Sequence, residues 1–136
     1  MIKSDAQRER TAAQIEGFRR ALAMATRETA GKRSAALRGS YQSMIGQLED
    51  ELREYDRLKS GKLALPHVER LDRIAPFIAK IRIAKGISQT ELAQRLGVSK
   101  QVISRYEENE YQTVALTRLQ EILDAIGVKT LVTLSA

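Results

Sequence analysis

The sequence has no cysteine and no tryptophan, and its 136 residues include only two prolines and one histidine. Without cysteine there is no disulfide, no thiolate zinc site and no cysteine nucleophile. The single histidine, His67, stands beside a proline and has no carboxylate pair at ligand spacing, which favours neither a metal site nor acid–base catalysis. The glycines are scattered and form no phosphate-binding loop. We therefore expect neither an enzyme nor a cofactor.

Long apolar runs are also missing. No run approaches the length of a membrane span, and the N-terminus lacks the apolar core of a signal peptide. These absences predict a cytoplasmic protein with no membrane contact. Charge, by contrast, is plentiful: 23 basic residues against 17 acidic ones give a formal net charge of +6, which favours polyanionic partners. The length suits one domain or two small ones.

The most informative stretch is residues 88–107, SQTELAQRLGVSKQVISRYE. Apolar side chains recur on one face of each half, which predicts two short helices. Gly97 suits the end of the first helix, because glycine accepts a positive φ without steric cost. Ser99 suits the N-cap of the second helix. Ala93 is small enough for a steep crossing of two helices, and Ile103 supplies the branched apolar contact. The spacing indicates a helix-turn-helix.

This pattern resembles the Cro/phage-repressor (XRE) family. The resemblance is carried by Gln89, by Glu91-Leu92-Ala93, by Leu96-Gly97-Val98-Ser99, by Ile103-Ser104-Arg105 and by Glu107. It implies an all-α, lambda-repressor-like helix-turn-helix bundle that binds double-stranded DNA. It also implies a partly buried ion pair between Arg82 and Glu107.

The second helix of the motif, residues 99–108, is expected to enter the major groove. Side chains at its start and one turn later are predicted to read bases, and those around the motif to contact phosphates. The base-reading set is Lys100, Gln101, Ser104 and Arg105; the phosphate set is Lys85, Ser88, Gln89, Thr90, Arg95, Ser99 and Asn109. After Glu107 the sequence departs from the family, because Glu108 and Glu110 make the following loop a weak phosphate binder.

The distribution of charge agrees with this interpretation. Residues 62–105 carry nine basic and three acidic side chains, whereas residues 106–136 carry two basic and five acidic ones. The positive charge is therefore concentrated in the segment that is expected to face DNA, as in a duplex-binding protein.

The remaining segments complete the predicted organisation. Apolar stripes predict an antiparallel helical hairpin, with helices up to about residue 29 and from 34 to 58, interrupted at 29–34. We assign residues 1–60 to this hairpin, for dimerisation or partner binding, and 61–136 to the DNA-binding domain. The domain includes helices at 76–85 and 116–126, the latter with an inner face. That face comprises Leu116, Leu119, Ile122, Leu123 and Ile126.

Residues 128–134, VKTLVTL, follow a glycine and are rich in branched side chains. They predict a short C-terminal β-strand that could pair with a second subunit, with a frayed tail as the alternative. The Val128–Leu134 strand and the hairpin are the two candidate dimer contacts, and the hairpin is favoured because it can bury more apolar area.

Two functions remain open from the sequence. The first is a sequence-specific regulator that acts as a homodimeric repressor on a two-fold-related operator. The second follows from similarity to HigA-type antitoxins and prophage regulators, which repress their own operon and bind a toxin protein. A third, a helical adaptor in which the motif is only a scaffold, is disfavoured by the basic base-reading positions.

Overall fold

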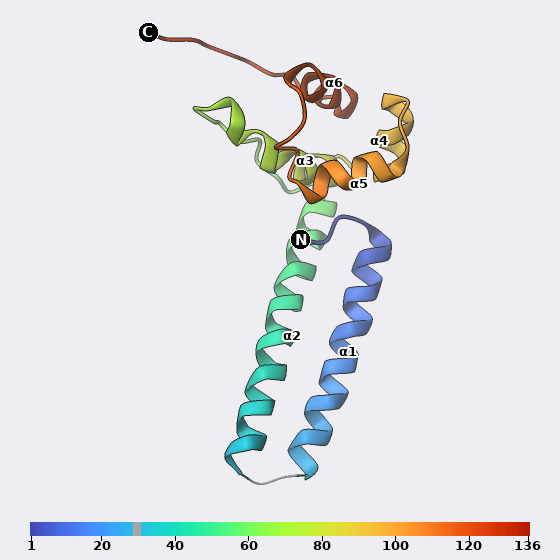
Figure 1. Ribbon diagram of the computed structural model, residues 1–136, viewed down its shortest axis with the longest axis vertical. Helices are drawn as coiled ribbons and strands as arrows, with labels where there is room; N and C mark the ends of the chain where they lie inside the picture. The colour runs from blue at the N-terminus through green and yellow to red at the C-terminus, as the bar shows by residue number, and fades with distance from the viewer. Residues whose placement is uncertain (29–30) are drawn as a thin grey trace. The chain divides into compact units, whose positions relative to one another are not determined.

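The computed structural model describes residues 1–28 and 31–136, and every regular element within these ranges is helical (Figure 1). The all-α prediction is therefore confirmed. The chain divides into two compact units, Met1–Arg57 and Leu58–Ala136. The first is the helical hairpin, and the second contains the helix-turn-helix segment.

The hairpin consists of α1, Asp5–Glu28, and α2, Lys32–Lys59, which run antiparallel. Ser4 Oγ accepts a hydrogen bond from the Gln7 N–H (3.2 Å) at the start of α1, as expected of an N-cap residue. The predicted interruption at 29–34 falls partly outside the described residues, which omit 29 and 30. Of the rest, Gly31 has a φ of +146° and α2 begins at the next residue.

Paired side chains hold the two helices in register. The Arg8 guanidinium donates to both Asp56 carboxylate oxygens (2.7 and 2.9 Å) and, chiefly through these hydrogen bonds, lowers the pKa of Asp56. The Phe18 and Tyr41 rings lie 6.0 Å apart, centroid to centroid. Buried apolar side chains lie on both helices: Ile15 and Ala25 from α1, Ile45 and Tyr55 from α2. Other apolar side chains stay at the surface: Met24, Leu37 and Met44. The hairpin therefore buries only a narrow apolar core.

The second unit begins at Leu58, in the last turn of α2. Residues 62–70 then form no helix or strand, and two short 3₁₀ segments follow, η1 (Leu71–Arg73) and η2 (Ala75–Phe77). Four helices follow: α3 (Ile78–Ala84), α4 (Gln89–Leu96), α5 (Lys100–Glu108) and α6 (Leu116–Ile126). The predicted 76–85 helix is thus shorter than expected, because the segment around Pro76 adopts the tighter 3₁₀ form. A single apolar cluster lies between the helices. Its fully buried members are Ile78, Leu92, Ile103 and Ile122.

The turn between α4 and α5 has the predicted geometry. Gly97 ends α4 with φ 67° and ψ 30°, in the left-handed region. The Val98 N–H donates to the Ala93 carbonyl (3.0 Å), the hydrogen bond that closes a Schellman motif. Ala93 is 3% exposed, so its methyl group lies at the closely packed contact that the sequence indicated.

Two expectations are wrong. Residues 128–136 form no strand; the part of the chain that the structure describes contains none. The physical reason is that a lone strand leaves its backbone groups without a partner, and the helical bundle offers no sheet edge. Leu131 and Leu134 are accordingly 95% and 92% exposed. Leu116 was expected on the inner face of α6, but it stands in the first turn and is 66% exposed.

We expect Gly97→Ala to lower the free energy of unfolding of the second unit by about 1 kcal/mol, because an L-residue resists the left-handed region. A Cβ at this position would meet no atom within 4 Å, so the cost arises from backbone conformation alone. Gly97→Asn should cost less, since asparagine tolerates this region. Urea unfolding followed by circular dichroism measures both, and equal losses for the two variants would contradict this explanation.

Candidate nucleic-acid interface

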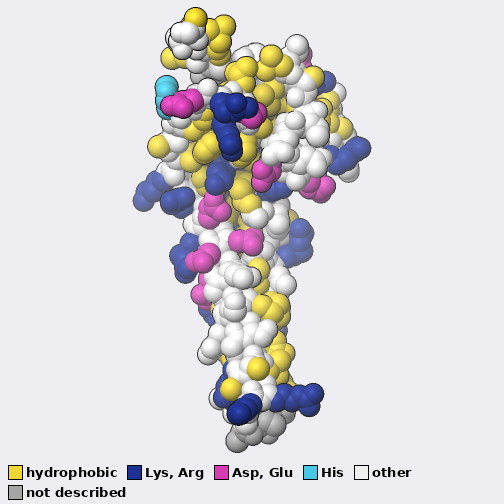
Figure 2. Space-filling view, turned by 60° about the vertical axis from the view of Figure 1, so that its left-hand side comes forward, with side chains coloured by type: hydrophobic (Ala, Val, Ile, Leu, Met, Phe, Trp, Pro, Cys, Tyr) yellow, Lys and Arg dark blue, Asp and Glu magenta, His cyan; other side chains and the backbone are white. Residues whose placement is uncertain are grey.

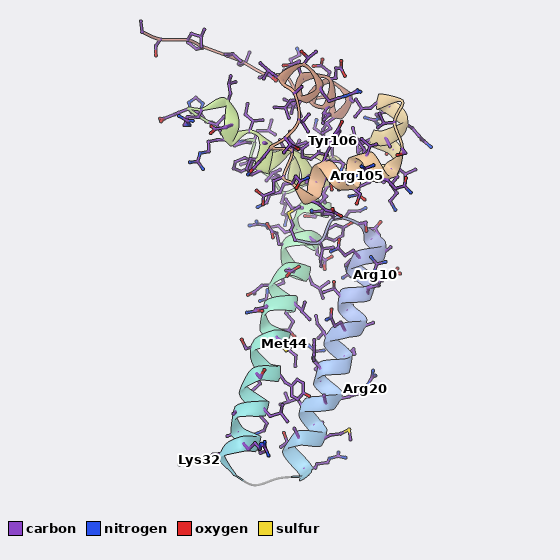
Figure 3. The ribbon with its side chains drawn as sticks, in the orientation of Figure 1. Arg10, Arg20, Lys32, Met44, Arg105 and Tyr106 are labelled. Atoms are coloured by element: carbon purple, nitrogen blue, oxygen red, sulfur yellow. The ribbon has the colours of Figure 1, made fainter. Side chains whose placement is uncertain are left out.

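Helix α5 presents a polar face to solvent and an apolar face to the core. Lys100, Gln101 and Arg105 are exposed and Ser104 is half-buried, whereas Ile103 is fully buried. Because residues three and four positions apart are neighbours on a helix, Gln101, Ser104 and Arg105 share one surface. Arg105 is labelled on α5 in Figure 3. The structure therefore brings together the four candidate base-reading side chains on the accessible side of one helix.

Several candidate phosphate contacts lie at or near the starts of α4 and α5, before the base-reading side chains in the sequence. Ser99 occupies the N-cap of α5, but its side chain makes no capping hydrogen bond, so only half of the sequence expectation holds. Ser88 does cap α4: its Oγ accepts from the Glu91 N–H at 3.0 Å. Thr90 is exposed in the first turn of α4, and Lys85 is exposed directly after α3. Backbone N–H groups and hydroxyls at helix starts are suitable partners for phosphate oxygens.

Two other candidate phosphate contacts are engaged within the protein. Gln89 is only 7% exposed, and its Nε2 donates to Glu107 Oε2 (2.8 Å). Arg95 donates to the Ala125 carbonyl and to Glu91, both at 2.7 Å, which ties α4 to the end of α6. The structure thus places the Gln89 side chain inside the domain rather than beside the other candidates, and it gives Arg95 an internal role.

The position of α5 depends on a buried ion pair, which the sequence comparison had suggested. Arg82 Nε and Nη2 donate to the two carboxylate oxygens of Glu107 at 2.5 and 3.0 Å. Arg82 is 2% exposed and Glu107 is 1% exposed. A third guanidinium nitrogen, Nη1, donates to the Ile87 carbonyl (2.7 Å) just before α4. One arginine of α3 therefore holds both the entry to α4 and the last turn of α5.

Two further side chains donate hydrogen bonds to the Glu107 carboxylate. Gln89 brings in the first turn of α4, and the Tyr111 hydroxyl donates to Oε1 at 3.3 Å from the loop after α5. Burial, and next the Glu107 charge, raise the pKa of Tyr111 well above its ordinary value, so its hydroxyl stays protonated and able to donate. Charged groups buried with this many hydrogen bonds fix a geometry, because each lost partner leaves an uncompensated charge.

The loop after α5 is shaped by this network. Asn109 caps α5 from an exposed position, and Glu110 and Tyr111 both adopt positive φ values, 52° and 58°. Such values are unfavourable for side chains of this size. The buried Tyr111 ring, 5.9 Å from that of Tyr106, provides the compensating contact. Sequence reasoning missed the roles of Gln89 and Tyr111, because a polar residue and a tyrosine outside an apolar stripe carry no pattern that predicts burial.

Comparison with known proteins agrees with this geometry. Residues 78–132, which include α3 to α6, match the family model described as helix-turn-helix. This segment is therefore similar to a helix-turn-helix domain, in agreement with the resemblance that residues 88–107 carry. The match supports the predicted DNA-binding domain.

A similar segment occurs in an archaeal protein. Over 49 residues the chain is 49% identical to the "Putative HTH-type transcriptional regulatory protein" of Methanocella arvoryzae (strain DSM 22066 / NBRC 105507 / MRE50). The match covers 35% of this chain and 15% of that protein, so it extends over a small part of the relative's length. No solved structure matches the chain.

Residues 1–28 and 31–136 contain no cluster of three or more His, Cys, Asp or Glu that could hold a metal ion. None of their helices combines the length and apolar character that crossing a membrane requires.

Glu107→Gln should lower the stability of the second unit by about 3–5 kcal/mol, because it leaves the buried Arg82 charge without its counter-ion. Glu121→Gln is the matched control: that carboxylate pairs with Arg118 (2.8 Å) at the surface, where the loss should stay within about 0.5 kcal/mol. Urea titrations at pH 7 measure both variants. A loss below 1 kcal/mol for Glu107→Gln would contradict the central role of the pair.

Proposed function

We propose that the chain is a sequence-specific transcriptional regulator that binds a two-fold-related operator as a homodimer and acts as a repressor. Each subunit inserts α5 into the major groove. The observation that carries the proposal is the row formed by the exposed Gln101, the half-buried Ser104 and the exposed Arg105 on α5, whose last turn is held by the buried Arg82–Glu107 pair. The name of the archaeal relative, which describes transcriptional regulation, supports it.

The chemistry of the exposed face suits base recognition. An arginine such as Arg105 donates two hydrogen bonds to guanine O6 and N7, and a glutamine such as Gln101 both donates and accepts at adenine N6 and N7. Lys100 suits guanine or a phosphate. The half-buried Ser104 contributes a short hydroxyl, which contacts any base within reach and discriminates weakly. Specificity is therefore assigned chiefly to Arg105 and Gln101.

The phosphate contacts are assigned to side chains around this helix. Lys85, Ser88, Thr90, Ser99 and Asn109 are exposed, and hydroxyl, amide and ammonium groups all bind phosphate oxygens. Gln89 and Arg95 serve this surface indirectly, because both position α4. The carboxylates of Glu108 and Glu110 repel phosphates at the end of α5, where Asn109 is the only assigned phosphate contact.

The homodimer follows from the size of the reading surface. One recognition helix contacts only a few base pairs, too few to select a single site in a genome, so two-fold symmetric proteins read two half-sites. Occupation of such an operator near a promoter blocks transcription, which is the repressor role. The antitoxin role would add a toxin bound by the hairpin; it stays a prediction, because no motif accompanies toxin contact.

Arg105→Ala should weaken specific binding by about 1–3 kcal/mol and relax the preference at one base pair of each half-site; Gln101→Ala should do the same at a neighbouring base pair. Fluorescence anisotropy with the operator and with a scrambled duplex measures the affinity ratio. Arg118→Ala, on α6, is the control and should leave that ratio unchanged. If Arg105→Ala and Gln101→Ala also leave it unchanged, α5 is not the recognition helix.

Lys85→Ala should weaken binding to all duplexes alike, since a phosphate contact carries no sequence information. The slope of log K against log salt should fall by about one unit, as one counterion fewer is released. Binding isotherms at several salt concentrations test this. Lys129→Ala removes the same charge from the exposed C-terminal tail and should leave the slope unaltered. If Lys85→Ala instead reduces the preference for the operator over a scrambled duplex, Lys85 contacts a base and not a phosphate.

A further inference from the structure

A line of accessible side chains runs along the outer flank of α2. Its members are Arg33, Leu37, Ser40, Met44, Gln47 and Glu51, and we call them the α2 flank stripe. Successive members are three or four residues apart, so they follow one line along the helix. The first five are exposed. The Glu51 side chain is 41% exposed, and its carboxylate forms an ion pair with the N-terminal ammonium of Met1 (3.5 Å) in the same chain.

The stripe carries two large apolar side chains among polar ones, and its two ends carry opposite charges. Leu37 and Met44 are 47% and 39% exposed, although the same helix buries Ile45 and Tyr55 on its inner side. Figure 2 shows hydrophobic side chains along one edge of the hairpin, and Figure 3 labels Met44 on α2. Arg33 and Glu51 stand about five helical turns apart at the two ends. Large apolar side chains between charges are typical of a helix that packs against another protein surface.

The stripe is complementary to itself when reversed. Its members are arranged symmetrically about the level of residue 42, so that each has a counterpart at the same distance on the other side. Arg33 corresponds to Glu51, Leu37 to Gln47, and the small Ser40 to the large Met44. A two-fold axis at this level would place the basic end on the acidic end of the partner subunit, and each serine beside a methionine. A two-fold interface requires this kind of self-complementarity.

We propose that a second copy of this chain docks on the α2 flank stripe, with the two α2 helices antiparallel. In that arrangement Arg33 faces Glu51 of the partner subunit, and the symmetry makes this contact twice. The parallel arrangement would instead place Arg33 against Arg33 of the partner subunit. Like charges in direct contact are unfavourable, so the charge pattern selects the antiparallel dimer.

The charge of the whole hairpin is polarised in the same direction. Residues 17–48, the half around the turn, carry six basic side chains and one acidic one, whereas the other half, residues 1–16 and 49–59, carries six basic and eight acidic ones. In Figure 2 the magenta side chains of the hairpin lie in the half away from the turn, whereas dark blue ones occur in both halves. Antiparallel packing of two such hairpins aligns each basic half with an acidic region, which supports a second copy as the occupant rather than an unrelated protein.

The contact has a suitable length. Helix α2 has 28 residues and is therefore about 42 Å long, enough for two helices to meet over several turns on each side of the axis. Exposed ion pairs add little affinity by themselves. The affinity is assigned to Leu37 and Met44 of both copies, and the orientation to Arg33 and Glu51.

This inference deepens the homodimer proposed above and rests on it, but its test needs no DNA. The molar mass of the full chain is measured by light scattering and its dimer dissociation constant by sedimentation equilibrium. Arg33→Glu alone and Glu51→Arg alone should each raise that constant roughly tenfold or more, through two like-charge contacts. The double variant Arg33→Glu/Glu51→Arg should restore the original value, because both contacts are reversed together.

The control is Lys32→Glu, which makes the same charge change in the same turn but lies outside the stripe (Figure 3). It should leave the dissociation constant unchanged. Leu37→Glu/Met44→Glu should yield monomers with unaltered helix content, because both side chains are already at the surface. Either of two results would overturn the proposed antiparallel dimer: a parent chain that is monomeric at micromolar concentration, or a double charge variant whose dissociation constant does not return to the original value.

An unchanged dissociation constant in all these variants would assign the stripe to a different partner, and would also overturn the proposal. The function proposed above fails separately. Monomeric stripe variants should still bind a single half-site weakly and in an Arg105-dependent manner. Half-site binding that does not depend on Arg105 would contradict α5 as the recognition helix, without testing the proposed dimer contact.

Discussion

The geometry of the DNA-binding unit depends on one carboxylate, that of Glu107, and the hydrogen bonds it accepts. Arg82 from α3 contacts it with two nitrogens, Gln89 adds the start of α4, and Tyr111 adds the loop after α5. Three helices and a loop thereby meet at one buried charge. A pair of this kind is a poor source of net stability, because desolvation offsets most of the Coulomb attraction. Its effect is to define one arrangement of α3, α4 and α5, which an apolar contact of similar volume would define less strictly.

This constraint links the interior of the domain to its reading surface. Glu107 is buried and Arg105 is exposed, yet the two are separated by a single residue on α5. The rotation of the helix that brings Glu107 onto Arg82 therefore also determines which side chains face outward. Base recognition requires donors and acceptors to be positioned within a fraction of an ångström, and side chains on a rigid helix meet that requirement better than those on a loop. Under the proposed function, the buried pair therefore contributes to specificity by fixing the orientation of α5.

The sequence was most informative where local geometry is strict. Position 97 has a left-handed backbone that favours glycine, and position 93 has room only for a small side chain. The spacing of these two residues therefore predicts the helix-turn-helix directly from the sequence. The sequence was least informative where a residue's role depends on distant parts of the chain. Gln89 is a polar residue of a type usually found at the surface. It is buried because its side chain donates a hydrogen bond to Glu107, 18 residues later. The strand prediction for residues 128–134 was wrong for the same reason. Branched side chains favour a strand, but a strand also needs a neighbouring strand to pair with its backbone groups.

The hairpin and the DNA-binding unit use charge in different ways. In the DNA-binding unit the positive charge precedes Tyr106, and the acidic side chains that follow confine it to one segment. In the hairpin, positive and negative regions succeed one another along the helices, a pattern that suits a partner with the same pattern reversed. A two-helix arm with so narrow a core gains stability from any partner that covers its exposed apolar side chains, because binding to the folded form alone shifts the folding equilibrium. For the proposed homodimer, arm folding, self-association and operator binding are therefore linked equilibria: a process that favours one of them favours the others.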